Sequence, residues 1–199
     1  MSLSVITRLM SMGRWEPDAA GRLLEAALEL FSERGYEQTT VADIAQKAGV
    51  TERTFFRYYA DKREVLFGGG TELEATVVAS IAAAPSSAAP LEAVVAAISA
   101  IGLLLDERRE FARRRAAVIA SNASLQEREL LKLAALSAAA SSALRDRGAG
   151  AAEAALAAET GMVLFKVSFE RWIAGPSARS IADYVKEAAR ELTALAAKL

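Results

Sequence analysis

Three neighbouring side chains in the segment TERTFFRYY have the types and spacing to bind nucleic acid. Arg53, Phe56 and Arg57 stand at i, i+3 and i+4, so a helix places them on one face. Guanidinium groups are the usual bidentate partners of guanine and of phosphate, and a helix that carries them fits the major groove. Thr54 and Tyr58 flank this face, where the threonine could contact a phosphate or a thymine methyl group. The pattern predicts a DNA-reading helix.

Taken alone, the same residues have a simpler interpretation. Arginines on a helix surface are usually solvated, and aromatic pairs usually belong to the core. The preceding sequence favours the DNA-reading interpretation, because Val41, Ala45, Gly49 and Phe55 stand at positions one, five, nine and fifteen of one segment. A helix-turn-helix needs a small residue for close helix approach, a glycine for the turn and an apolar residue to fix the second helix.

Elements that would position this motif can be read from caps and apolar spacing. A first helix is predicted from about Pro17 to Arg34, and Gly35 is its C-terminal cap. Its expected buried face consists of Leu23, Ala27, Leu30 and Phe31. Thr39 and Thr40 offer hydroxyl caps for a second helix that ends at Gly49. A third helix covers roughly residues 52–59, and a fourth begins near Asp61; the predicted buried set is Ile44, Ala45, Val50, Phe55 and Tyr59.

Composition excludes several kinds of chemistry. The chain has 199 residues, of which 53% are hydrophobic and 25% charged, with a net charge of −1. It contains no histidine and no cysteine, so serine–histidine triads, histidine-ligated zinc and disulfides are impossible within it. No cofactor, metal site or catalytic residue is predicted, and we do not expect an enzyme. No signal peptide or membrane span is predicted, and we expect a soluble, cytoplasmic protein.

The rest of the chain reads as five further helices, which gives an all-α fold of about nine helices. The breaks between them are expected at APSSAAP (84–90), a charged corner at 106–110, SNAS (121–124), RGAG (147–150) and AGPS (174–177). Ser124 with Glu127 and Ser180 with Asp183 are predicted capping boxes. Because the early helices are short and the later ones long, we predict a flexible tail (1–16), a helix-turn-helix domain (17–66) and a larger helical-bundle domain (67–199).

The segment AALELFSERGYEQTTVADIAQKAGVTERTFFRYYADKREVLF, residues 26–67, resembles the TetR-like family of transcriptional regulators. The resemblance implies a DNA-binding homodimer, most often a repressor of a palindromic operator, whose larger domain binds a small ligand. It implies no enzymatic activity. By residue-to-residue match, the positions where family members touch DNA are Thr40, Val41, Glu52, Arg53, Thr54, Phe56, Arg57, Tyr58 and Lys62. Of these, Thr40 and Lys62 are expected at phosphates, and the two arginines at bases or phosphates.

Two positions depart from the family pattern. Phe56 stands where the family more often has tyrosine, so a phosphate-binding hydroxyl is missing, and contact with a thymine methyl or a sugar is the alternative. Gly68 to Gly70 interrupt what is usually one continuous helix, and each glycine costs up to about 1 kcal/mol against alanine in a helix. The triplet is predicted to break or kink the helix, either as a simple bend or as a hinge through which ligand binding alters DNA binding.

The larger domain is expected to hold an effector and to form the dimer. A mainly hydrophobic or aromatic effector is predicted to contact Phe67, Phe111, Val118, Met162, Phe165, Phe169 and Trp172. Ordinary core packing is the alternative for each of them. The predicted dimer interface, a four-helix bundle with the last two helices of a partner, consists of Leu156, Val163, Val167, Ile181, Val185, Ala188, Leu192 and Leu195. Packing within a single chain would also explain the apolar residues on either of these two helices.

Other interpretations remain open from the sequence. The run DERREFARRR (106–115) could supply an arginine to an anionic group of the effector, or could be a solvated helix face. Arg8 and Arg14 could form a minor-groove arm, or could belong to a disordered tail. The rival class of function is an enzyme or carrier with a lipid-like ligand, and a third is a binding protein that has lost DNA affinity.

Overall fold

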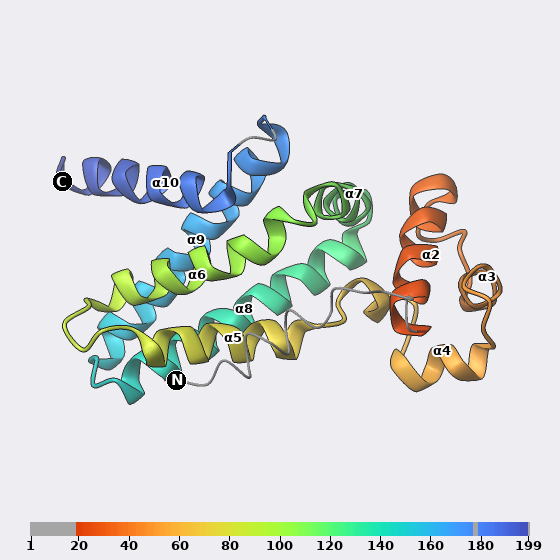
Figure 1. Cartoon of the computed structure of the whole chain (residues 1–199), viewed down its shortest axis with the longest axis horizontal. Coiled ribbons are helices and arrows are strands. Elements are labelled where there is room, and N and C mark those ends of the chain that lie inside the picture. Colours follow the sequence, from red (N-terminus) through yellow and green to blue (C-terminus); the bar gives the residue numbers. More distant parts are fainter. Residues whose placement is uncertain (1–18, 177–178, 199) are drawn as a thin grey trace. The chain divides into compact units, whose positions relative to one another are not determined.

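The computed structural model describes residues 19–176 and 179–198, and helices dominate this range (Figure 1). The described elements are α2 (Ala19–Arg34), α3 (Val41–Lys47), α4 (Glu52–Tyr58), the 3-10 helix η1 (Glu64–Leu66), α5 (Gly70–Ala83), α6 (Pro90–Asp106), α7 (Arg109–Ala120), α8 (Ala123–Asp146), α9 (Ala151–Ala174) and α10 (Ile181–Ala196). The predicted all-α fold of about nine helices is confirmed for this part of the chain. The predicted tail, with Arg8 and Arg14, lies outside the described residues.

The chain divides into two units, Met1–Gly68 and Gly69–Leu199. In the smaller unit, α2 packs against α3, α4 and η1. Its core is formed by fully buried side chains from each of these elements, including Leu23, Ile44, Phe55 and Val65. The predicted face of α2 is confirmed, because Leu23, Ala27, Leu30 and Phe31 are all buried. The smaller unit is therefore a packed three-helix domain that can hold α4 firmly.

The larger unit is a bundle in which α6 packs against α5, α9 and α10, while α8 packs against α5, α7 and α9. Figure 1 shows α10 along one side of this bundle, next to α6 and α9. Buried side chains of α6, among them Val94, Ile98 and Ile101, form the centre of the core. Gly161 lets α9 approach α6 closely, since a Cβ atom there would overlap the side chain of Val94. The close crossing of α9 and α6 thus depends on a residue without a side chain at this position.

Most predicted helix ends agree with the observed ones. The helices α5 to α9 end or begin at each of the five predicted breaks, from APSSAAP to AGPS. The capping box of Ser180 with Asp183 is confirmed at the start of α10. The one predicted for Ser124 is wrong, because the side chain of Asn122 accepts from the amides of Ser124 and Leu125 and caps α8 instead.

The predicted break at Gly68 to Gly70 is confirmed, but the fourth helix begins after this break and not before it. Gly69 has φ 82, a left-handed conformation that favours glycine, and α5 begins only at Gly70 rather than near Asp61. Within the described residues, one helical stretch, Glu64–Ala83, is long and apolar enough to cross a membrane by length and composition alone. Sequence reading expected no such stretch. It is interrupted at Gly69, so it forms two helices rather than one straight span.

Candidate functional site: a candidate nucleic-acid interface

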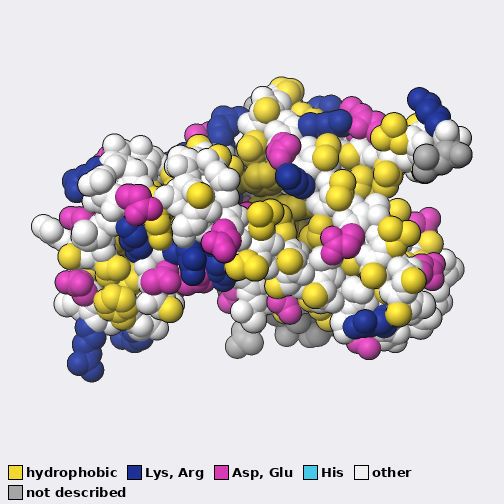
Figure 2. Space-filling view, turned by 180° about the vertical axis from the view of Figure 1, so that it is seen from behind, with side chains coloured by type: hydrophobic (Ala, Val, Ile, Leu, Met, Phe, Trp, Pro, Cys, Tyr) yellow, Lys and Arg dark blue, Asp and Glu magenta, His cyan; other side chains and the backbone are white. Residues whose placement is uncertain are grey.

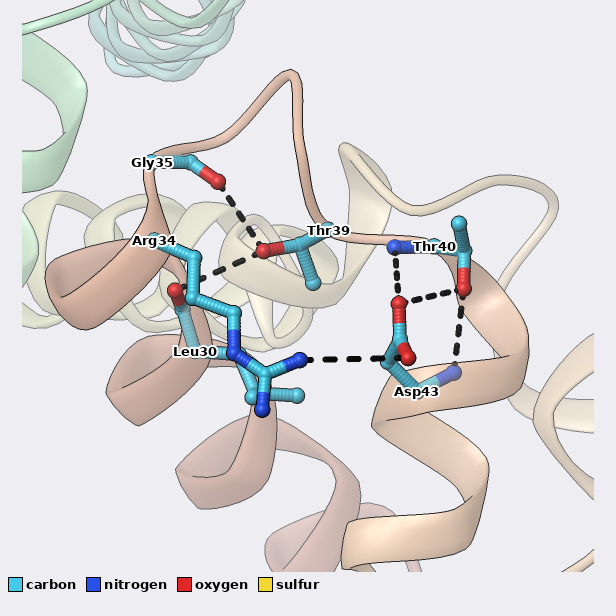
Figure 3. A network of polar contacts seen from close by, with 6 residues as sticks. All are labelled: Leu30, Arg34, Gly35, Thr39, Thr40 and Asp43. Carbon is cyan, nitrogen blue, oxygen red and sulfur yellow. Dashed lines mark hydrogen bonds and ion pairs between the residues drawn. The ribbon is translucent and has the colours of Figure 1, made fainter.

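The turn before α3 is fixed by a reciprocal pair of hydrogen bonds. The hydroxyl of Thr40 accepts from the amide of Asp43, and the Asp43 carboxylate accepts from both the amide and the hydroxyl of Thr40 (Figure 3). These hydrogen bonds from Thr40 lower the pKa of Asp43 below its ordinary value. In the same view Thr39, predicted as a second cap, instead donates to the carbonyls of Leu30 and Gly35. Thr40 therefore sets the start of α3, and its predicted contact with phosphate stays a prediction.

Helix α4 combines a buried anchor with an exposed outer face. Thr51 caps its start by accepting from the amide of Thr54, and Phe55 is fully buried. Phe56 is 54% exposed and Tyr58 42% exposed, although both are large aromatic residues. Arg53 and Arg57 are exposed on the same helix. The burial pattern agrees with the predicted one, because Phe55 faces the core while Arg53, Phe56 and Arg57 face solvent.

Carboxylates neutralise some of the cations expected near this face. Lys47 forms an ion pair with Glu29 at 2.7 Å, and Arg63 lies 3.7 Å from a carboxylate oxygen of Glu64. Sequence reading expected only Glu52 and Asp61 to oppose the local positive charge, so it overestimated the positive field. Among the described residues, Arg53 has no hydrogen-bond or ion-pair partner.

Arg57 lies close to the phenol of its neighbour. Its guanidinium donates to the Tyr58 hydroxyl at 3.0 Å and lies 4.9 Å from the ring centroid of Tyr58. A phenol leaves the positive charge of Arg57 uncompensated, unlike a carboxylate. Arg53 and Arg57 are therefore the cations of α4 that are available to a phosphate or to a base.

Lys62 has a structural role that the sequence did not predict. Its ammonium donates to the carbonyls of Tyr36, Glu37 and Thr39 at 2.9 to 3.4 Å, and it lies 4.3 Å from the ring centroid of Tyr36. An ammonium has three protons, so these carbonyls occupy all of them. The lysine thus ties the loop between α2 and α3 to the chain after α4. Its predicted contact with phosphate would require it to leave at least one of these carbonyls.

The remaining predicted DNA residues lie at the starts of the two helices. Val41 is the first residue of α3 and Glu52 the first of α4, and Glu52 is exposed. Thr54 is half-buried, and its hydroxyl lies 3.1 Å from that of Thr51. Of the predicted buried set, Ile44, Ala45 and Phe55 are buried, whereas Val50 and Tyr59 are only partly so.

The predicted effector residues of the larger unit form part of its packed interior. Met162 and Trp172 are buried in the core, and Phe165 and Phe169 pack partly buried against it. The rings of Phe165, Phe169 and Trp172 follow one another with centroids 5.8 and 5.7 Å apart. Val118 is buried and Phe111 half-buried on α7. Phe67 was predicted to line the same pocket, but it belongs to the smaller unit, where it is 4% exposed.

Of the predicted dimer interface, the structure buries the residues in the first half of α10 and leaves others at the surface, where the interface stays a prediction. Ile181, Val185 and Ala188 are buried within their own chain, so they cannot form the surface that was assigned to them. Apolar residues that recur at alternating intervals of four and three positions predict a buried helix face. They do not show which helix packs against that face. By contrast, exposed apolar residues remain at Leu156 (71%), Val163 (58%) and Leu195 (63%). Val167 and Leu192 are partly buried.

A charged cluster in the larger unit escaped sequence reading. The stripe of α8 that contains buried Leu125 and Leu136 also contains Glu129 and Lys132 between them. Arg115 of α7 donates to both carboxylate oxygens of Glu129, at 3.2 and 2.7 Å. Burial opposes ionisation of Glu129, but the hydrogen bonds and charge of Arg115 outweigh it and keep its pKa below the ordinary value. The signal available in the sequence was the pair of charged residues at i+4 and i+7 from Leu125.

Lys132 should make the stability of the protein depend on pH. Desolvation, together with the charges of Arg115 and Arg128, lowers the pKa of Lys132 to about 8, from 10.5, although Glu129 opposes the change. Between these values the unfolded chain binds the proton that the folded chain has lost, so stability rises as the pH increases from about 8 to 10.5. The full shift corresponds to about 3 kcal/mol, and we expect roughly half because the side chain keeps some contact with water.

The measurement is urea unfolding of the natural protein and of Lys132→Met across this pH range. The natural protein should gain stability relative to the variant between the two pKa values, and below pH 8 the variant should be the more stable one. A constant difference at every pH would contradict the assignment. The comparison cancels the titration of tyrosines and of other lysines, which both proteins share.

Comparisons with known proteins agree with this geometry. Residues 23–67 match the family described as bacterial regulatory proteins, tetR family. The transcriptional regulator TcmR of Streptomyces glaucescens is 39% identical over 80 residues, which cover 40% of this chain and 35% of that protein. The chain thus aligns with about a third of the length of this relative.

Two solved structures resemble most of the chain. The Thermus thermophilus repressor FadR, in complex with lauroyl-CoA, has a TM-score of 0.54 and 23% identity, covering 87% of this chain and 93% of its own. The Bacillus subtilis FadR, in complex with stearoyl-CoA, has a TM-score of 0.58 and 19% identity, covering 84% and 94%. At these identities the likeness establishes the fold alone. Residues 23–67 thus match the family of bacterial tetR regulatory proteins, and the fold of the described residues is similar to that of the two FadR structures.

Proposed function

We propose that this protein is a cytoplasmic transcriptional repressor that binds an inverted-repeat operator as a homodimer and is released by a hydrophobic small molecule. The observation that carries the proposal is the exposed face of α4, where Arg53 and Arg57 flank Phe56 and have no carboxylate partner within residues 19–176 and 179–198. Arginines without a competing carboxylate can form bidentate hydrogen bonds with guanine or with phosphate. Phe56 offers an apolar contact to a thymine methyl group or a sugar.

The proposed dimer would supply the specificity that one unit lacks. One helix-turn-helix contacts few bases, whereas a two-fold pair reads half-sites whose centres lie roughly 34–36 Å apart, one turn of DNA. Support for the dimer comes from Leu156, Val163 and Leu195, large apolar residues that a monomer leaves exposed to water. Figure 2 shows hydrophobic side chains spread over one surface of the larger unit. The interface we now propose is the outer stripe of α9 with the end of α10, without the buried first half of α10.

The proposed effector would act through the larger unit. Its interior aromatic row, Phe165, Phe169 and Trp172, supports a partly hydrophobic ligand. Acyl-CoA molecules are bound in the two FadR structures, and we extend this to the present chain as a ligand with an apolar tail. Release requires the ligand to favour one of two states of the dimer, by as much as its differential affinity for them. Gly69 offers a point at which the second state could differ.

Selection from randomised duplex DNA tests the proposal. Purified full-length protein is incubated with a random library, and retained duplexes are sequenced after several rounds. We expect an inverted repeat whose half-site centres are separated by one helical turn, or by a multiple of it. Enrichment of a single, unsymmetrical site would argue against the homodimer while keeping DNA binding. No enrichment, even at low ionic strength, would overturn the regulator function itself.

A further inference from the structure

Glu52 is a carboxylate on α4 that takes no part in holding the smaller unit together. Three carboxylates lie within residues 41–63, and two of them form hydrogen bonds with the backbone. Asp43 caps the start of α3, and Asp61 accepts from two amides at the start of η1. Glu52 is exposed and, among the described residues, has neither a hydrogen bond nor an ion pair. Its carboxylate is therefore available to whatever binds α4.

The position of Glu52 places it beside the face that Arg53, Phe56 and Arg57 form. It is the first residue of α4 and stands four positions before Phe56, so the two side chains are neighbours along the helix surface. When a reading helix enters the major groove, its N-terminal residues reach the base edges. The same position brings the carboxylate near the phosphates that border the groove. Because a carboxylate repels phosphate, Glu52 weakens binding to any duplex that offers it no hydrogen-bond donor.

Two bases present a donor to a carboxylate in the major groove. Cytosine presents its N4 amino group and adenine its N6 amino group, whereas guanine and thymine present acceptors. Adenine also places the acceptor N7 beside its amino group, where it repels the second carboxylate oxygen. Cytosine has no acceptor on its own major-groove edge. Cytosine is therefore the base that best compensates the charge of Glu52.

We propose that Glu52 is a specificity-determining residue, which selects a cytosine in each half-site of the operator and lowers the affinity for other duplexes. The inference rests on the proposed DNA-binding function of α4 and specifies part of its target. Arg53 and Arg57 attract any duplex through its phosphates, whereas Glu52 adds a repulsion that one base compensates. Specific interfaces commonly combine attraction with a repulsive element of this kind.

A purely structural role for Glu52 makes a different prediction. A negative charge in the first turn of a helix stabilises that helix through its dipole. This role would act on folding stability and would leave the base preference unchanged. Glu153 is the matched control, because it is exposed and lies in the first turn of α9. Its replacement removes the same charge from the same position of a different helix.

The first test compares base preferences. The full-length natural protein, Glu52→Ala, Glu52→Gln and Glu153→Ala each select duplexes from one randomised library at the same salt concentration. The natural protein should enrich a cytosine at one position of each half-site, and Glu52→Ala should lose this preference. Glu52→Gln should prefer adenine there, because an amide forms a bidentate pair with N6 and N7 of adenine. Glu153→Ala should select the natural site.

The second test measures affinities by fluorescence anisotropy. The duplexes are the selected site, the same site with the C·G pair replaced by T·A, and an unrelated duplex of equal length. In the natural protein the replacement should weaken binding roughly tenfold, or about 1.4 kcal/mol, since thymine presents an acceptor to the carboxylate. In Glu52→Ala the replacement should have little effect. The unrelated duplex should bind Glu52→Ala about three- to tenfold more tightly, because the repulsion from phosphate is gone.

The inference is overturned if Glu52→Ala keeps every base preference of the natural protein, or if it binds the unrelated duplex no more tightly. Loss of a preference for a base other than cytosine would overturn it as well. These results would leave DNA binding by the natural protein intact. If the natural protein itself enriches no duplex, the proposed function fails, and the role of Glu52 fails with it.

Discussion

Replacing Arg53 and Arg57 together by alanine should lower the affinity for the selected duplex by about 100-fold or more at physiological salt. Each arginine that contacts a base in bidentate fashion contributes about 1–3 kcal/mol, and a phosphate contact adds an electrostatic part. The two side chains are exposed and take no part in the core that Phe55 anchors. The fold and the proposed dimer should therefore survive, and fluorescence anisotropy with a labelled duplex would measure the loss.

A matched control separates this effect from net charge. The double replacement of Arg145 and Arg190, both exposed on the larger unit, removes the same two charges far along the sequence from α4. It should weaken binding only slightly. Repeating both titrations at two salt concentrations identifies the contacts, because loss of phosphate contacts flattens the salt dependence, whereas loss of base contacts does not. Equal losses in both double variants would contradict the assignment of α4 as the DNA-reading helix.

The sequence predicted the helix ends well because caps and breakers act locally. Thr40, Gly35 and the five loop segments each fix the chain through their own backbone conformation or nearest amides. Asn122 shows where this fails. The segment SNAS contains several residues that can cap a helix. Whether Asn122 or Ser124 caps α8 depends on the backbone conformation there, which the sequence does not specify.

Predictions of what packs against each apolar helix face were less reliable. A row of apolar residues predicts that the face is buried, but not whether the same chain or a second subunit buries it. Ile181 and Val185 were assigned to a second subunit, yet they pack within their own chain. Lys62 illustrates the same limit for charge, since a lysine near a DNA-reading helix is expected to meet phosphate. Here the ammonium of Lys62 donates instead to three backbone carbonyls of its own chain. The charged cluster at Lys132 was missed because no local rule marks a partly buried cation in an otherwise ordinary helix.

Arg109→Met should destabilise the larger unit by about 3 kcal/mol. This is the largest effect on stability that we expect from replacing one partly exposed residue. The guanidinium of Arg109, at the start of α7, donates to the carbonyl of Trp172 and to those of Gly175 and Pro176 at 2.6 and 2.7 Å. It thereby caps the end of α9 with a positive charge, where the helix dipole is negative. Hydrogen bonds from a charged donor contribute about 1.5–3 kcal/mol each, and methionine keeps the stem but none of the donors.

Unfolding in urea, followed by tryptophan fluorescence, would measure this loss. The guanidinium of Arg109 lies 5.2 Å from the ring centroid of Trp172, so this tryptophan reports on the contact directly. The chain has two tryptophans, and a Trp15→Phe background leaves Trp172 as the sole probe. Arg190→Met on the exposed face of α10 is the control, with an expected change within about 0.5 kcal/mol. If Arg109→Met behaved like this control, the hydrogen bonds from Arg109 to the end of α9 would contribute nothing measurable to the stability of the larger unit.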